Sequence, residues 1–265
     1  MEKLQIIKIG GQVIESESIL ESFLKDLAGI QDKMIVVHGG GKLTTQLAQK
    51  LGVEQQLVDG RRITDAETLK IATMVYAGLI NKQLVVRLQS LGKDALGLSG
   101  TDLNCIQTVL RKKGDTDYGF AGDLFAKSIN TSKFQTLLEM GCTPVVCSIT
   151  HDGKGQLLNT NADTLASGLA VALSPFYEIQ LNYCFEKSGV MLNPEDDTTV
   201  FDNLSVLEYK GLKEKGIIHS GMIPKLDNAF DALSMGVSGI IIGHSGKIKQ
   251  MIAKKDHHGT ELKSA

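Results

Sequence analysis

The sequence contains only four cysteines, and no two of them form a CxxC pair. We therefore assign the thiols no chemistry and expect them to be reduced and buried, as in a cytoplasmic protein. The sequence also lacks a charged-then-apolar leader and any apolar run near the roughly 18 residues that a membrane span requires. These absences predict a cytoplasmic protein with no membrane partner.

A large excess of charge of one sign is also missing, because 28 basic and 30 acidic side chains leave a net charge of −2. This balance provides no basic field for nucleic acid, so any anion must be bound by local geometry. No repeat or Pro/Ser-rich linker marks a domain boundary. The 265 residues suffice for one large domain or for two lobes that share a sheet. For two lobes we expect the seam near Ser174–Pro175, which gives lobes of residues 1–174 and 175–265.

The sequence does contain short β-branched runs that alternate with helical periodicity. This pattern is typical of an α/β fold whose mainly parallel sheet is covered by helices on both faces. The expected core strands are 4–9, 34–37, 143–149, 178–183 and 238–243. Helices are expected near 162–172, 204–214 and 222–236. Shorter runs between 95 and 130 predict hairpins that lie over one end of the sheet and cover the substrate.

Apolar spacing also predicts the buried faces of three further helices. The first should bury Ile19, Phe23, Leu24 and Leu27. The second, which Gly52 should end, should bury Leu43, Leu47 and Leu51. The third should bury Leu69, Ala72, Tyr76, Leu79 and Ile80. At the start of this third helix, Thr64 and Glu67 predict a capping box in which Thr64 is the cap.

Two strand ends carry consecutive glycines, Gly10–Gly11 and Gly39–Gly41. A glycine turn between a strand and a helix presents backbone N–H groups without interference from Cβ atoms, which suits a phosphate. A single turn of this kind is explained as an ordinary tight connection, whereas two on neighbouring strands favour phosphate binding. Neither turn has the Walker spacing GxxxxGK[ST] or the dinucleotide pattern GxGxxG.

Two lysines and an Asn/Asp cluster complete the candidate site. Lys8 lies within a strand that should be buried, where an ammonium is costly unless it reaches an anion, although a lysine that extends to solvent fits equally well. Lys225 is expected in the first turn of a helix, where the dipole disfavours a cation, so a ligand is one reason for its position. In "NTNAD" (159–163), Asn159 and Asp163 either organise a site or simply start a helix.

The segments "KIGG", "HGGGK", "GRRIT", "GLSG", "NTNAD" and "GMIPK" follow one another over nearly the whole chain. Together they resemble the amino acid kinase family. The resemblance implies a three-layer αβα sandwich with an open, mainly parallel central sheet. It implies phosphoryl transfer from ATP, with phosphate-bound Mg²⁺, to the side-chain carboxylate of an N-acylated glutamate. The N-terminal lobe would bind the acylglutamate and dimerise, and the C-terminal lobe would bind ATP.

The same resemblance implies a role for each matching residue. The catalytic residues would be Lys8 and Lys225, which neutralise the transferring phosphoryl group, and Asp163, which orients both lysines. The nucleotide would contact glycines, namely Gly10, Gly11 and Gly221. The acylglutamate would contact Gly40, Gly41, Arg62 and Asn159, the last two at its α-carboxylate. A carboxylate nucleophile is already ionised at neutral pH, so the chemistry needs no general base, and the sequence has no HRD motif.

Some features leave alternatives open. Segment 181–191 lacks the Asp of the LTDVxGV-like run that is usual in the family and adds Glu186 and Lys187, which leaves the nucleotide contacts there open. Because Arg61 and Arg62 are adjacent, two acyl groups of the substrate stay open. We rank N-acetyl first and N-succinyl second, since the additional carboxylate of the succinyl group could use the extra arginine. Carbamate, aspartate and uridylate kinases share the sheet, but Arg62 with "NTNAD" favours an acylated amino acid. A non-catalytic metabolite sensor is the alternative from another class.

The start of the chain and the histidines bear on assembly and metal binding. Family members that arginine inhibits resemble one another in an N-terminal helix that joins dimers into a hexamer, and here the first strand begins by Leu4. We therefore expect a homodimer insensitive to arginine, with helix 65–91 as one candidate contact surface unless it only packs on the sheet. The histidines of "DHHG" (256–259) have no third ligand nearby, so we predict a solvated turn there and no metal site.

Overall fold

The computed structural model describes residues 1–58, 60–193, 195–218, 222–255 and 259–264. Gly221 and most of the "DHHG" turn therefore lie outside the described residues. The chain forms two compact units, unit 1 with residues 1–34 and 166–265 and unit 2 with residues 35–165. The functional division into lobes 1–174 and 175–265 stays a prediction.

The sheet of unit 1 has the strand order β12-β14-β13-β11-β1. Its three central strands are parallel, namely β1 (Lys3–Ile9), β11 (Glu178–Phe185) and β13 (Gly239–His244). β14 (Thr260–Lys263) runs antiparallel to β13 and pairs with β12 (Asn203–Ser205). The core strands have near-continuous apolar runs that are buried, as expected of parallel strands covered on both faces. The three predicted strands of this unit are confirmed.

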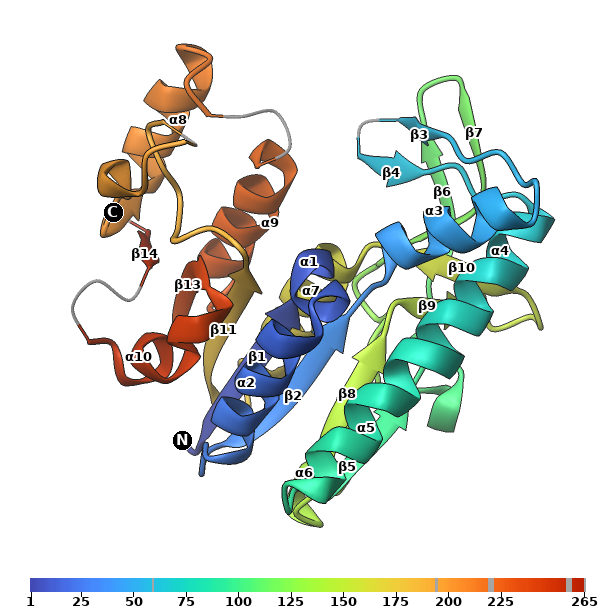
Figure 1. Ribbon diagram of the computed structural model, residues 1–265, viewed down its shortest axis with the longest axis horizontal. Helices are drawn as coiled ribbons and strands as arrows, with labels where there is room; N and C mark the ends of the chain where they lie inside the picture. The colour runs from blue at the N-terminus through green and yellow to red at the C-terminus, as the bar shows by residue number, and fades with distance from the viewer. Residues whose placement is uncertain (59, 194, 219–221, 256–258, 265) are drawn as a thin grey trace. The chain divides into compact units, whose positions relative to one another are not determined.

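The helices of unit 1 are α1 (Gly11–Glu15), α2 (Glu17–Ala28), α8 (Val206–Glu214), α9 (Ile223–Ser234) and α10 (Ile248–Ala253), with 3₁₀ turns η3 (Asp197–Thr199) and η4 (Ser245–Lys247). Figure 1 shows α2 lying along β1. The prediction for α2 was wrong at Ile19, which is 38% exposed. Leu20 is buried in its place, because Leu20 keeps helical spacing with Leu24 and Leu27.

Unit 2 contains three parallel strands in the order β2-β8-β5, with bounds Lys33–His38, Thr143–Cys147 and Ala95–Leu98. A second sheet has the order β6-β7-β10-β9, with bounds Val109–Lys113, Thr116–Asp123, Leu157–Thr160 and Ile149–His151. The hairpin predicted between 95 and 130 is confirmed for β6 and β7. It was wrong for 95–98, because this segment pairs with β8 and completes the parallel strands. A short hairpin joins β3 (Leu57–Val58) to β4 (Arg61–Arg62).

The helices of unit 2 are α3 (Gly41–Lys50), α4 (Ala66–Thr73), α5 (Asn81–Ser90) and α6 (Thr131–Glu139), with a 3₁₀ turn η2 (Asp102–Asn104). Between α4 and α5 lies a π-helix, η1 (Met74–Ile80), so the three segments form one continuous rod (Figure 1). The π-helix turns less per residue than an α-helix. Leu79, predicted to be buried, is therefore rotated outward and is 50% exposed. Helix α7 (Ala162–Leu173) starts in unit 2 and continues into unit 1.

Two further predictions in unit 2 were wrong. Helix α3 buries Thr44 and Ala48 instead of the leucine stripe, because these small side chains let α3 pack against α4. Gly52 nevertheless follows the helix end with φ +72°, as predicted for a stop. The cap of α4 is Asp65, which accepts a hydrogen bond from Thr68 N at 2.7 Å. Thr64 is instead held by backbone bonds to the neighbourhood of Gly119.

The predicted α/β class with a large, mostly parallel central sheet is confirmed. Among the residues that the structure describes, no helix is both long enough and apolar enough to cross a membrane.

Candidate active site

In unit 1, the candidate residues gather at the carboxyl end of β11. Lys8 on β1 is paired in register with Tyr183. Two residues further on, Gly10 N donates a hydrogen bond to Cys184 O at 2.7 Å. A Cβ atom on Gly10 would lie 3.1 Å from both Cys184 O and Phe185 Cβ. A side chain at Gly10 would thus push the turn away from β11, which explains one glycine of "KIGG". By contrast, nothing lies within 4 Å of a Cβ at Gly11, so packing does not require that glycine.

Lys225 reaches the same end of β11 from α9. It lies in the first turn of that helix, as predicted, and Pro224 occupies one of the first two helical positions. Its ammonium Nζ lies 4.8 Å from the ring centroid of Phe185 and 6.0 Å from that of Tyr183. An aromatic face attracts a cation at such distances. The structure therefore brings Lys8, Gly10 and Lys225 together around the last residues of one strand.

A cavity of about 380 Å³ opens beside these residues in unit 1. Its size is that of a small-molecule site. Its walls combine apolar side chains with charged ones, namely Phe185, Glu186, Lys187, Gly189, Val190, Met191, Glu195, Ile218, Met222 and Lys225. The segment that departs from the family pattern thus supplies much of this lining. The cavity thus combines an apolar wall with side chains of both charges.

In unit 2, the glycine turn Gly39–Gly41 connects β2 to α3. A Cβ atom on Gly40 would overlap with Ile80 Cδ1 and lie 2.8 Å from Tyr76 Cδ1. On Gly39 and Gly41 the nearest atoms would be at 3.5 Å, an ordinary contact distance. Packing inside the protein therefore requires only the middle glycine. Packing does not explain the other two glycines.

Arg62 lies beside this turn. Its Nη2 donates to Gly41 O at 2.9 Å and to Thr45 Oγ1 at 3.0 Å, and its Nη1 donates to Gln55 Oε1. The guanidinium is thus held at the start of α3, where Gly40 and Gly41 are predicted to bind the substrate.

Asn159 on β10 is linked to Arg62 through Thr64. Asn159 Nδ2 donates to Thr64 Oγ1 at 3.1 Å, and Thr64 Oγ1 donates to Arg62 O at 3.0 Å. The structure therefore brings together Gly41, Arg62 and Asn159 within one unit. Sequence reasoning missed the connecting Thr64, because the pattern "TDAE" indicated a helix cap there.

Asp163 lies in the first turn of α7, as predicted. Asn161 starts this helix, since its Oδ1 accepts a hydrogen bond from Thr164 N at 2.9 Å. Arg61 holds the same turn, because its Nη2 donates to Thr164 Oγ1 at 2.8 Å. Burial and the neighbouring Arg111 lower the pKa of Arg61, and the carboxylates of Asp123 and Asp163 oppose this shift.

His38 ends β2 and is completely buried, which lowers its pKa from 6.5 to about 4. We expect this to make stability pH-dependent: the unfolded chain takes up a proton below pH 6.5, whereas the folded chain resists it until about pH 4. The contribution of His38 is therefore complete above pH 6.5 and is lost as the pH falls toward 4. At pH 5 the loss is about 2 kcal/mol of unfolding free energy.

Urea unfolding at pH 7.5, 6 and 5 measures this loss, with His38→Gln as the control for all other titrating groups. The wild-type protein should lose about 2 kcal/mol more than the variant over this range. Parallel pH dependences of the two proteins would contradict the prediction.

Across the described residues, no group of three or more His, Cys, Asp or Glu side chains is arranged to hold a metal ion. A family model described as "Amino acid kinase family" matches residues 3–244 of the chain. The chain belongs to the amino acid kinase family. This match contains every candidate residue in both units of the amino acid kinase fold.

Two curated relatives are similar over nearly their whole length. The chain is 49% identical over 263 residues to an acetylglutamate kinase of Cytophaga hutchinsonii, which covers 99% of each protein. It is 48% identical over 250 residues to an acetylglutamate kinase of Parabacteroides distasonis, which covers 94% of this chain and 97% of that one. Among solved structures, a protein of Streptococcus mutans superposes with a TM-score of 0.81 at 25% identity and covers 99% of both chains.

Proposed function

We propose that the protein is an acetylglutamate kinase, which transfers the γ-phosphoryl group of ATP to the side-chain carboxylate of N-acetyl-L-glutamate in arginine biosynthesis. The observation that carries this proposal is the 49% identity over 99% of the chain to a relative of that name. The presence of Lys8, Asp163 and Lys225 supports it, because these are the positions where the chemistry needs charge.

The residues of unit 1 suit the nucleotide and the phosphoryl group. Two anions must approach each other, and negative charge must be stabilised on the transferring group, which is the work of cations and N–H donors. Lys8 and Lys225 converge on the end of β11 and supply this charge. Gly10 keeps the backbone close to the strand end. The lysines need no proton transfer, since the attacking carboxylate is already ionised.

We propose that the cavity of unit 1 binds ATP with its Mg²⁺. Val190, Met191 and Ile218 offer an apolar wall for the base, and Lys187 and Lys225 offer charge for the phosphates. Mg²⁺ neutralises phosphate oxygens and takes hard oxygen ligands, a donor type that the cavity offers through its glutamates. Nucleotide binding in this cavity is therefore consistent with the residues that replace the usual family segment.

The residues of unit 2 suit the amino acid. Arg62 presents a planar guanidinium that binds a carboxylate in two parallel hydrogen bonds once the substrate replaces its contacts with Thr45 and Gln55, and Asn159 adds an amide. We propose that both bind the α-carboxylate and that Gly40 and Gly41 donate backbone N–H groups. The role of Asp163 in orienting the two lysines stays a prediction from the family resemblance.

Two alternatives are not favoured. An N-succinyl substrate is less favoured because the relatives at 49% and 48% identity are acetylglutamate kinases. A non-catalytic sensor would not need to retain both lysines. The homodimer and the cytoplasmic location remain predictions from the sequence.

The test is ATP turnover with N-acetyl-, N-succinyl- and free L-glutamate, with the acyl phosphate trapped by hydroxylamine. We expect turnover with the N-acetyl compound at the highest kcat/KM. A higher kcat/KM for the N-succinyl compound would establish the first alternative, and binding without turnover of any of the three would establish a sensor.

Replacing Arg62 by lysine should raise KM for N-acetylglutamate at least tenfold and leave KM for ATP nearly unchanged. An ammonium cannot reproduce the paired geometry of a guanidinium on a carboxylate. Initial rates with each substrate varied separately measure both constants. A raised KM for ATP with an unchanged KM for the amino acid would place Arg62 at the nucleotide instead.

A further inference from the structure

Behind the glycine turn of unit 2 lies a chain of buried hydrogen bonds that the proposed chemistry does not use. His38 Nδ1 lies 2.9 Å from Gly39 O, and His38 Nε2 lies 3.1 Å from Asn81 Nδ2. Asn81 Nδ2 also donates to Val145 O at 2.8 Å. Asn81 is 99% buried, at the first position of α5 after the π-helix.

These partners determine which nitrogen of His38 carries the proton. The buried carbonyl of Val145 needs a donor, so the NH₂ group of Asn81 must face it, and this same group faces His38 Nε2. Nε2 is therefore an acceptor, and the proton is on Nδ1, which donates it to Gly39 O. Lys82 Nζ lies 3.3 Å from Asn81 Oδ1 and donates to it. Each polar atom of the pair thus has a partner of the right kind.

The hydrogen bond to Gly39 O determines the direction of the next N–H group. In a trans peptide the C=O and N–H bonds point in opposite directions, and the described residues contain no cis peptide bond. Because Gly39 O faces the buried imidazole, Gly40 N–H points away from it. Gly40 is the residue whose N–H is assigned to the substrate.

We propose that His38 is a positioning residue, whose Nδ1 holds the Gly39–Gly40 peptide so that Gly40 N–H faces the reacting groups. This inference rests on the proposed function for its kinetic effect but not for its structural one. A donor fixed before the reaction stabilises developing charge without reorganisation, whereas a peptide free to rotate does not.

The burial of His38 and of its neighbour Cys147 keeps both side chains uncharged near neutral pH. Cys147 lies opposite His38 on β8, and burial raises the pKa of its thiol to about 12, so it stays neutral. Asp102 and Lys82 both act electrostatically on Cys147, and Tyr76 interacts with it from the π-helix. Burial lowers the pKa of His38 to about 4, so the imidazole accepts from Asn81 throughout the neutral range.

Two variants of similar polarity separate the hydrogen bonds of His38. In His38→Asn, the amide nitrogen takes the place of Nδ1, so the bond to Gly39 O is retained and that to Asn81 is lost. In His38→Gln, the amide takes the place of Nε2, so the bond to Asn81 is retained and that to Gly39 O is lost. Both variants remove a buried ring, so a merely structural role predicts similar losses in both.

We expect His38→Gln to lower kcat at least tenfold with little change in KM for ATP, and His38→Asn to stay within about threefold of the wild type. Hydrogen exchange of the Gly40 amide, measured without substrates, should quicken at least tenfold in His38→Gln only. Equal kcat and equal exchange in the two variants would overturn the inference. A wild-type protein without kinase activity would refute the proposed function, while the exchange measurement would still decide the inference.

Discussion

Replacing Lys8 or Lys225 by alanine should each lower kcat about 100-fold or more while leaving the fold intact. Lys8 pairs in register with Tyr183 near the carboxyl end of β11, and the Lys225 ammonium lies 4.8 Å from the ring centroid of Phe185. Under the proposed function, both lysines compensate charge on the transferring phosphoryl group. Removing one oriented electrostatic partner from such a site costs about 3–4 kcal/mol of transition-state stabilisation. Saturating rates with ATP and N-acetylglutamate measure kcat, and circular dichroism and thermal unfolding check the fold.

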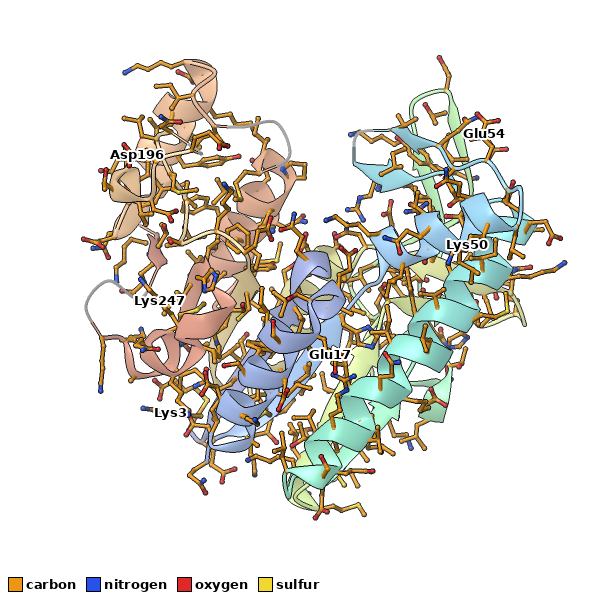
Figure 2. All side chains as sticks on the ribbon, viewed as in Figure 1. Lys3, Glu17, Lys50, Glu54, Asp196 and Lys247 are labelled. Atoms are coloured by element: carbon orange, nitrogen blue, oxygen red, sulfur yellow. The ribbon has the colours of Figure 1, made fainter. Side chains whose placement is uncertain are left out.

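Lys3→Ala is the matched control for Lys8→Ala. Lys3 is an exposed lysine of the same strand at its amino end, away from Gly10 (Figure 2). The control removes the same charge from the same strand and should keep kcat within about twofold of the wild type. A folded Lys8→Ala protein with near-wild-type turnover would refute the role of Lys8. For Lys225→Ala, the same result would mean that the contact with Phe185 is only structural.

The lysine positions could be predicted because they depend on local periodicity. A β-branched run predicts strand β1. The carboxyl ends of parallel strands meet at one edge of the sheet. Lys8, Gly10 and the end of β11 therefore meet whenever the strands pair in parallel. Lys225 follows in the same way, since the pattern after "GMIP" predicts that it lies in the first turn of a helix.

The partners that hold the substrate residues could not be predicted, because they depend on pairings across long stretches of sequence. The backbone of Thr64 pairs with Gly119, so Thr64 does not cap the helix. Its side chain instead links Arg62 to Asn159. "TDAE" offers two residues that both cap helices well, and only tertiary pairing selects Asp65.

The π-helix could not be predicted from the sequence for a different reason. No common sequence signal marks a π-turn, and the apolar positions of Met74–Ile80 fit an α-helical pattern almost as well. Tertiary contacts surround it: Tyr76 and Ile80 lie against Gly40, and Asn81, the next residue, contacts His38. The wrong prediction that Leu79 is buried thus falls in the part of the helix that lies against the candidate site.

Replacing Gly40 by alanine should destabilise the protein and abolish most of its activity. The new methyl group would overlap with Ile80 Cδ1 and lie 2.8 Å from Tyr76 Cδ1, inside a packed core. Overpacking of this kind costs about 1–3 kcal/mol. Relief of the overlap would move Gly40 N–H away from the substrate, so we expect kcat/KM to fall at least 100-fold. Chemical unfolding and steady-state rates measure the two effects.

Gly41→Ala is the matched control, because its methyl group would meet only Arg62 Nη2 at 3.5 Å. Position 41 lies in α3, where alanine is a better helix former than glycine, so the unfolding free energy should not fall. If Gly41 is a glycine so that the ligand can approach its backbone, Gly41→Ala should lose activity without losing stability. Gly40→Ala should lose both.

The double variant Gly40→Ala/Ile80→Val tests the steric cause directly. Valine at position 80 lacks the Cδ1 atom that the new methyl group would overlap, although the contact with Tyr76 remains. In a double-mutant cycle, the loss for the pair should be smaller than the sum of the two single losses by about 0.5 kcal/mol or more. Simple additivity would mean that Ile80 does not restrict position 40. The need for glycine at position 40 would then come from Tyr76 or from the ligand.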